Sequence, residues 1–266
     1  MKLDPSKYYR MPLAMGPVFD RKALRLAYPQ VEVLAFQYLT EPEALRDLLP
    51  DCYHQGKEPL VTVLFSQNNG LWFMAGGGYR MAAVLLSARF DGRLDHVEGD
   101  YVVVMFEDHT WPIIGGREDL GIPKLFADIS SLKTMPDHHL RWEASLGGHL
   151  LFGLDVPPMK SQIAVLRVVA NRQINSRPWL GYKYIPSLDG PADADYPTII
   201  HNDSKINKLW MGKKSVLRFG IARYDDIGVV KNLLDRLATL TIVRPVQTVH
   251  FVGSATLRYD LSRRLR

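Results

Sequence analysis

Apolar residues recur with a period of two in several short stretches of the chain, which is typical of β-strands. These stretches are rich in β-branched and aromatic residues. Turn-forming residues separate many of them, at Gln67-Asn68-Asn69-Gly70, Asp91-Gly92 and Asp189-Gly190. The predicted strands are 31–39, 59–66, 101–106, 163–169, 216–224 and 241–251. The pattern therefore predicts a fold dominated by β-structure.

Two segments instead have the pattern of a helix. The first begins at Thr40-Glu41-Pro42-Glu43, which resembles a capping box with proline in the first turn, and ends before Pro50. The second runs from Asp226 to Leu240 and has one apolar side. That side consists of Val229, Val230, Leu233, Leu234, Leu237 and Leu240. No repeat or shift in composition marks a boundary, so residues 1–266 are expected to form a single β-rich α+β domain, either a barrel or a folded-over antiparallel sheet.

Composition narrows the classes of function. The 266 residues are 47% hydrophobic and 23% charged, which is ordinary for a globular protein. The net charge is +5, but the basic residues are spread out and do not form a stripe with aromatic residues, so no nucleic-acid partner is expected. Cys52 is the single cysteine, which excludes an internal disulfide. No apolar run approaches the roughly 18 residues of a membrane span, and a cytoplasmic location is expected.

One segment, residues 115–128, has a composition that suggests chemistry. Pro123 directly precedes Lys124, and Ile122, Leu125 and Phe126 surround the lysine in sequence. Burial among apolar side chains disfavours the charged ammonium and lowers the pKa of a lysine. A neutral amine is the form that attacks a carbonyl carbon. The alternative is an ordinary lysine whose stem packs on apolar residues while its ammonium group stays in water.

The same segment resembles a known family. Gly116-Arg117-Glu118 followed by Pro123-Lys124 resembles the reactive-lysine loop of the acetoacetate decarboxylase family, in which desolvation or a neighbouring cation activates the lysine. Further resemblance, from residue 31 onward, lies in 40–50, 58–61, 99–101, 177–190 and 257–260. The resemblance implies a closed, cone-like antiparallel β-barrel with surrounding strands and a few short helices. It also implies an imine at Lys124, a homo-oligomer, and no metal or organic cofactor.

Departures from the family pattern leave the reaction open. The decarboxylases carry a second lysine after the reactive one, where this chain has Leu125. They also have carboxylates in the pocket, in segments that correspond to residues 60–64 and 76–80 of this chain. Neither segment of this chain contains an acidic residue. Both acetoacetate-type decarboxylation and pyruvate-type aldolase or dehydratase chemistry are therefore candidate reactions. Arg80 is expected to bind the carboxylate of a small keto-acid substrate. The alternative is that Arg80 forms a surface salt bridge.

Other residues are candidates for the same site. Glu118 is a candidate proton shuttle, or else an ion-pair partner of Arg117. Tyr259 is a candidate general acid, or else a buried tyrosine with a satisfied hydroxyl. The side chains expected to shape the pocket, if they are not simply core, are Met105, Phe106 and Ile122. The alternative function for the whole chain is a non-catalytic module that binds small anions.

Two further patterns in the sequence are weaker. Gly76-Gly77-Gly78 lacks the Lys-Ser/Thr of a phosphate-binding loop and predicts a bulge or a close approach between strands. No spacing of histidine and cysteine matches a zinc site, so no metal is predicted.

Overall fold

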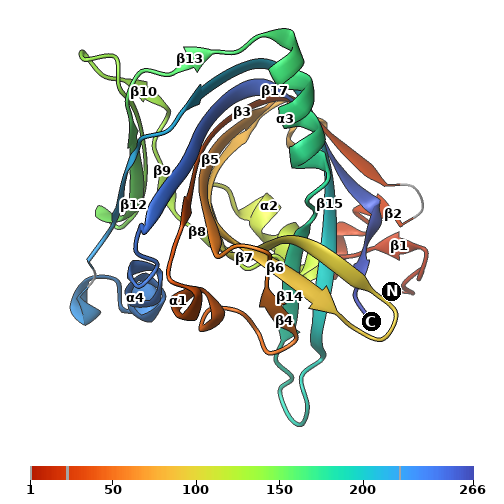
Figure 1. The fold of residues 1–266 in the computed structure, drawn as a ribbon. Coiled ribbons are helices and arrows are strands. Elements are labelled where there is room, and N and C mark those ends of the chain that lie inside the picture. The colour runs from red at the N-terminus through yellow and green to blue at the C-terminus, as the bar shows by residue number, and fades with distance from the viewer. Residues whose placement is uncertain (1, 22–23, 222) are drawn as a thin grey trace.

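The computed structural model describes residues 2–21, 24–221 and 223–266. Its main feature is a large sheet whose strands close into a ring (Figure 1). The ring closes because β6 pairs with β5 on one side and with β7 on the other. In ring order the strands are β6 (Tyr79–Asp91), β5 (Leu60–Asn69), β3 (Arg25–Leu39), β17 (Arg244–Arg264), β15 (Ala194–Gly212), β14 (Trp179–Ile185) and β7 (His96–Glu107).

Shorter strands extend this sheet. They are β4 (Tyr53–Gln55) beside β6, β8 (Lys124–Phe126) beside β7 and β13 (Lys160–Ser161) beside β15. The expectation of a β-rich fold is confirmed, but the expectation of a purely antiparallel sheet is wrong. β7 pairs in parallel with β14 and with β8. Parallel neighbours need a long crossover, and the segment between β7 and β8 provides one through α2 (Thr110–Gly115) and a π-helix (Gly116–Leu120).

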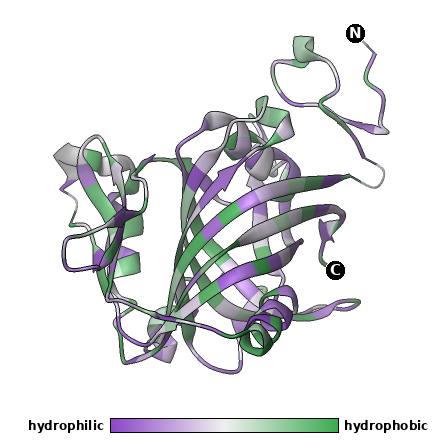
Figure 2. Ribbon diagram, turned by 90° about the horizontal axis from the view of Figure 1, so that it is seen from above, coloured by the Kyte–Doolittle hydropathy of each residue, from purple (hydrophilic) through white to green (hydrophobic). Residues whose placement is uncertain are grey.

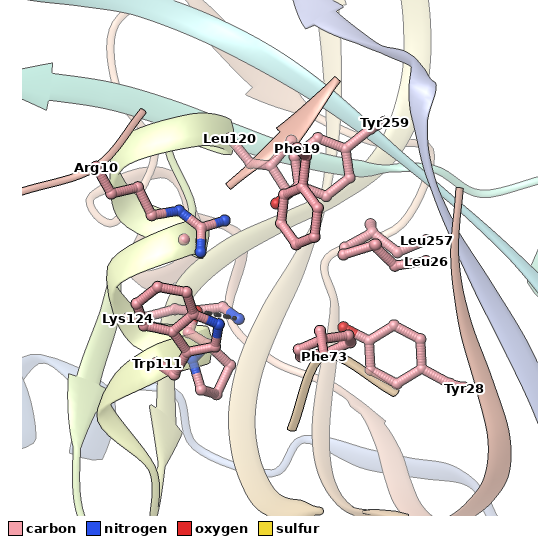
Figure 3. Close-up of a pocket in the computed structure, with 13 residues that line it drawn as sticks. Arg10, Phe19, Leu26, Tyr28, Phe73, Trp111, Leu120, Lys124, Leu257 and Tyr259 are labelled. Atoms are coloured by element: carbon pink, nitrogen blue, oxygen red, sulfur yellow. Dashed lines mark hydrogen bonds between the residues drawn. The ribbon is translucent and has the colours of Figure 1, made fainter. Parts of the chain in front are cut away.

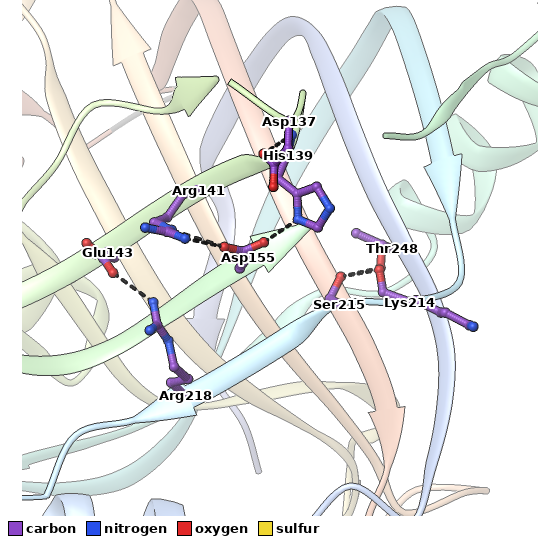
Figure 4. A network of polar contacts seen from close by, with 9 residues as sticks. All are labelled: Asp137, His139, Arg141, Glu143, Asp155, Lys214, Ser215, Arg218 and Thr248. Carbon is purple, nitrogen blue, oxygen red and sulfur yellow. Dashed lines mark hydrogen bonds and ion pairs between the residues drawn. The ribbon is translucent and has the colours of Figure 1, made fainter. Parts of the chain in front are cut away.

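A second sheet lies beside the ring, with strands β9 (Asp128–Ile129), β10 (Lys133–Thr134), β11 (Leu140–Leu146), β12 (His149–Val156) and β16 (Val216–Phe219). Its exposed face carries a polar network (Figure 4). Asp155 contacts both His139 and Arg141, and Arg218 contacts Glu143. Partly exposed pairs of this kind contribute little to stability, so the sheet depends mainly on its apolar face.

Two separate cores explain the alternation in the sequence. On β6, Ala82, Val84 and Leu86 face the core between the ring and the second sheet. The intervening Met81, Ala83 and Leu85 face a core inside the ring. A strand that is buried on both faces is therefore apolar almost throughout, while Figure 2 shows more mixed hydropathy along other strands.

The helices fit the sequence predictions unevenly. α1 (Pro42–Arg46) lies within the predicted first helix, but no side chain caps it, and the buried Thr40 hydroxyl has no partner among the described residues. α4 (Tyr224–Ala238) confirms the second helix. Its buried side closes the outer core with Val230, Leu234 and Leu237, and Leu240 joins that core just beyond the end of the helix. The side chain of Val229 lies outside the described residues.

The strand predicted at 163–169 is wrong, because this segment begins α3 (Ala164–Asn175). The reason is tertiary, since two polar side chains of α3 bind the backbone of β15. Asn171 accepts from the Ile206 amide, and Asn175 both accepts from and donates to the Ser204 backbone. These bonds lie beside a register shift in β15 and outweigh the β-propensity of the segment.

Two more predicted boundaries move. The strand predicted at 216–224 ends at Phe219, and the turn predicted at 67–70 begins only at Gly70, because β5 continues to Asn69. Gly220 must be glycine, since a Cβ there would lie 1.7 Å from the Leu150 carbonyl oxygen.

The first residues form a separate N-terminal arm (residues 2–21). It contains the two-stranded sheet of β1 (Lys7–Tyr8) and β2 (Phe19–Asp20) and a 3₁₀ turn (Leu13–Met15). A second 3₁₀ turn, Trp72–Met74, follows β5. In the part of the chain that the structure describes, no helix is long and apolar enough to cross a membrane.

Candidate functional site

Lys124 occupies the first position of β8, inside the ring. The parallel pairing of β8 with β7 sets Lys124 opposite Met105 and brings Glu107 close to it. The lysine is 7% exposed and Glu107 is fully buried. The Lys124 Nζ donates to the Glu107 Oε1 at 2.7 Å and to the Pro112 carbonyl oxygen at 3.2 Å. The crossover through α2 thus places a lysine amine, a carboxylate and a backbone carbonyl together.

The surroundings of the Glu107 carboxylate are unusual. Burial raises the pKa of this carboxyl group above its ordinary value, and the charge of Lys124 opposes that shift. Its second oxygen, Oε2, is buried and finds no hydrogen-bond partner among the residues described. A buried carboxyl group with a raised pKa and a free oxygen is suited to accept and return a proton.

Two adjacent glycines make room for the charged side chains. A Cβ at Gly116 would lie 2.4 Å from the Lys124 Cδ and Cε, and a Cβ at Gly115 would lie 2.5 Å from Arg10. Arg117 donates to the Lys124 carbonyl oxygen at 3.0 Å and fixes the backbone of the lysine. The Lys124 and Arg10 side chains therefore pack directly against the backbone of the segment Gly115–Arg117.

Arg10 enters the site from the N-terminal arm. It is buried and forms an ion pair with Asp119 of the π-helix at 2.5 Å. Its guanidinium also lies over the Trp111 ring at 5.1 Å. Tyr259 of β17 donates at 3.1 Å to the same Asp119 oxygen, Oδ2, that the Arg10 Nη2 binds. Burial raises the pKa of Tyr259 well above its ordinary value, so its hydroxyl stays protonated at neutral pH.

These side chains surround a cavity of about 30 Å³ (Figure 3). Lys124, Arg10 and Tyr259 line it together with apolar residues that include Phe19, Tyr28, Phe73, Trp111 and Leu257. The described lining offers one amine, one guanidinium and two tyrosine hydroxyls in an otherwise mostly apolar enclosure. Such a site can bind a small compound that has both a carbonyl group and a negative charge.

The structure brings only some of the candidate residues together. Lys124 and Tyr259 line the cavity, and Ile122 and Met105 belong to the apolar core around it. Phe106 points to the outer core. Glu118 contributes its backbone carbonyl to Lys183 and is absent from the cavity lining.

Arg80 also lies outside the cavity lining. Its guanidinium binds Asp108 at 3.2 Å and Gln67 at 2.8 Å, which is the salt-bridge alternative considered for it. Sequence reasoning missed Glu107, Arg10 and Asp119. Glu107 left one signal, as an acidic residue that directly ends an apolar strand. Arg10 left none, because the arm reaches the cavity only through the tertiary fold.

A closed ring of strands with one lysine amine buried at its centre beside a carboxylate defines the class of the fold and site. The chain belongs to the acetoacetate decarboxylase (ADC) family, whose model matches residues 10–262.

Known relatives agree with this assignment. An acetoacetate decarboxylase of Clostridium botulinum is 27% identical over 242 residues, covering 86% of this chain and 89% of its own. The crystal structure of the acetoacetate decarboxylase of Legionella pneumophila has a TM-score of 0.72 at 22% identity and covers 92% of this chain and 88% of that one. The enduracididine biosynthesis enzyme MppR, in its complex with pyruvate, has a TM-score of 0.71 at 18% identity and covers 99% of both chains. At these identities the two structures show the fold alone.

Proposed function

We propose that this protein is a carbon–carbon lyase that forms an imine between Lys124 and a small keto acid. The observation that carries the proposal is the placement of the Lys124 amine, which is buried at a cavity and held 2.7 Å from a carboxylate. Membership of the ADC family and the pyruvate complex of MppR support a keto acid as the substrate class.

Glu107 supplies the proton transfers that imine formation needs. The Lys124 ammonium first gives its proton to Glu107, whose raised pKa makes the carboxyl group a competent acceptor. The neutral amine then adds to the substrate carbonyl carbon. Glu107 returns the proton to the departing hydroxyl, so that one water leaves and a positively charged iminium faces the carboxylate.

The same carboxylate serves either outcome that the sequence leaves open. If a β-keto acid loses carbon dioxide, the electron pair moves into a neutral enamine, and Glu107 takes a proton from water and delivers it to carbon. If the acid is pyruvate-like, Glu107 removes a proton from the carbon next to the iminium, the enamine attacks a second carbonyl, and Glu107 gives the proton to the oxygen of that carbonyl as the iminium re-forms. Glu107 thus replaces, from a different strand, the carboxylates that the segments 60–64 and 76–80 lack.

Arg10 supplies the positive charge for the substrate carboxylate. It binds Asp119 through Nε and Nη2, while among the described residues its Nη1 makes no hydrogen bond. Tyr259 donates to the Asp119 Oδ2, which Arg10 also binds, and its role as a general acid stays a prediction. In this proposal Arg10 takes the role first expected of Arg80, whose guanidinium is engaged with Asp108.

Borohydride trapping tests the proposal. The protein is incubated with acetoacetate or with pyruvate, reduced, and measured by intact mass and peptide mapping. We expect an adduct at Lys124, and its mass shows whether carbon dioxide has left. Lys124→Met keeps the apolar stem and should abolish the adduct, while Lys133→Met, at an exposed lysine of β10, should leave it unchanged.

An adduct that persists in Lys124→Met would refute the assignment of the amine. If well-folded protein binds keto acids without any adduct, the function is that of a small-anion binding module. A cone-like closed barrel, a single domain, a homo-oligomer and a cytoplasmic location stay predictions from the sequence. Light scattering coupled to size-exclusion chromatography measures the oligomer.

A further inference from the structure

A second hollow adjoins the Lys124 cavity, on the side of the 3₁₀ turn Trp72–Met74. Its volume is about 410 Å³, against about 30 Å³ for the cavity at Lys124. Phe73 and Trp111 line both spaces, and Figure 3 shows these two side chains at the Lys124 cavity. The remaining lining of the outer hollow comes from Met74, Gly77, Gly78 and His109.

The outer hollow is apolar and aromatic in character. Among the residues that the structure describes, no acidic side chain, lysine or arginine lines it, and His109 is its single titratable side chain. The His109 Nδ1 already accepts from the Trp111 amide at 3.2 Å, as the cap of α2. A charged group placed there would lose its hydration without gaining an ionic partner, while an aromatic ring would gain contact with Phe73, Met74 and Trp111.

The Gly76-Gly77-Gly78 motif, for which the sequence predicts a bulge or a close approach between strands, contributes to this hollow. A Cβ at Gly78 would lie 2.1 Å from the Asn68 carbonyl oxygen, so this glycine permits the close approach of β5 and the start of β6. Gly77 lines the hollow without a side chain. The backbone therefore leaves open a space that any larger residue at Gly77 would begin to fill.

We propose that the outer hollow binds an aromatic or bulky apolar substituent on the keto acid whose carbonyl reacts at Lys124. The inference rests on the function proposed above and names the substrate class for that same site. Its argument is continuity: the cavity at Lys124 is small, the outer hollow beside it is larger, and the described residues that line both spaces, Phe73 and Trp111, are aromatic. The substituent passes between Phe73 and Trp111, and Arg10 stays with the carboxylate.

The test compares phenyl-bearing keto acids with their parents. Phenylpyruvate is set against pyruvate, and 3-oxo-5-phenylpentanoate against acetoacetate, with the concentration for half-maximal borohydride trapping as the readout. We expect the phenyl-bearing acid to saturate at a concentration about tenfold lower than its parent. Met74→Ala should raise that concentration about tenfold for the phenyl-bearing acids and leave the parents unchanged, because Met74 lines only the outer hollow.

Controls separate this inference from the proposed function. Met15→Ala removes the same side chain from a surface turn of the N-terminal arm and should change neither class of acid. Met74→Trp should obstruct the hollow and give the same selective loss as Met74→Ala by the opposite change in volume. Equal half-saturation for phenyl-bearing and parent acids, or an equal effect of Met74→Ala on both, overturns the inference alone. A failure of every acid to form an adduct at Lys124 overturns the proposed function and this inference with it.

Discussion

Gly116→Ala is the sharpest single test of the lysine's placement. A Cβ at this position would lie 2.4 Å from the Lys124 Cδ and Cε and 2.9 Å from its Nζ, while ordinary contact begins at 3.4 Å. The lysine stem must therefore move by about 1 Å. A displacement of about 1 Å in a reacting group can cost about 100-fold in rate. The backbone at Gly116 has φ of −64°, which alanine adopts readily, so the fold should be retained.

The assay is the rate of borohydride-trapped adduct formation, measured together with thermal unfolding. We expect the trapping rate to fall about 100-fold while the midpoint of unfolding changes by a few degrees at most. Gly212→Ala is the matched control, since its Cβ would meet only the flexible Met159 side chain at 3.0 Å, on a distant part of β15. A Gly116→Ala protein that forms the adduct at the normal rate would show that Lys124 does not react from this position.

Three further predictions concern other contacts. Glu107→Gln should lower the trapping rate by about 100-fold or more, because the amide cannot take the lysine proton, and unchanged kinetics would contradict its role. The Arg263 guanidinium and the terminal backbone lower the pKa of Asp95 to about 2, so its stabilising effect is present above about pH 4 and is lost as pH falls to about 2. The difference in melting temperature between Asp95→Asn and the unaltered protein should shrink over that window, and a constant difference would refute this linkage. Trp142→Phe should cost about 1–3 kcal/mol in denaturant unfolding, because the indole N–H donates to the Ser130 carbonyl at 2.6 Å, and a loss below about 0.5 kcal/mol would contradict it.

The sequence predicts the fold best where local pattern and tertiary burial agree. β3 alternates between buried and more exposed residues, and β7 is apolar over most of its second half because both of its faces are buried there. α4 shows its buried side through the spacing of Val230, Leu234 and Leu237. It fails at α3, where a β-prone segment becomes helical because Asn171 and Asn175 bind the backbone of a strand far away in sequence. Local propensity carries no information about such a partner.

The same contrast between local sequence pattern and tertiary contacts applies to the candidate site. Lys124 could be identified because Gly116-Arg117-Glu118 followed by Pro123-Lys124 resembles the reactive-lysine loop of the family, while its apolar neighbours alone left an ordinary lysine as the alternative. The placement of Glu107 depends on parallel pairing across a crossover, and that of Arg10 depends on an arm that folds against the ring. Neither arrangement has a local period, so no inspection of neighbouring residues reveals it.

The N-terminal arm gives the cavity a wall that is independent of the ring. Its strands β1 and β2 pair with each other and with no ring strand among the described residues, yet Arg10 and Phe19 line the cavity. Exchange of this arm between relatives would change which acids are accepted while the lysine and its carboxylate stay in place. By the same reasoning, an affinity tag or truncation at this end would alter the chemistry before it altered the stability. Divergence of substrate choice therefore needs few changes in the sheet that carries the reaction.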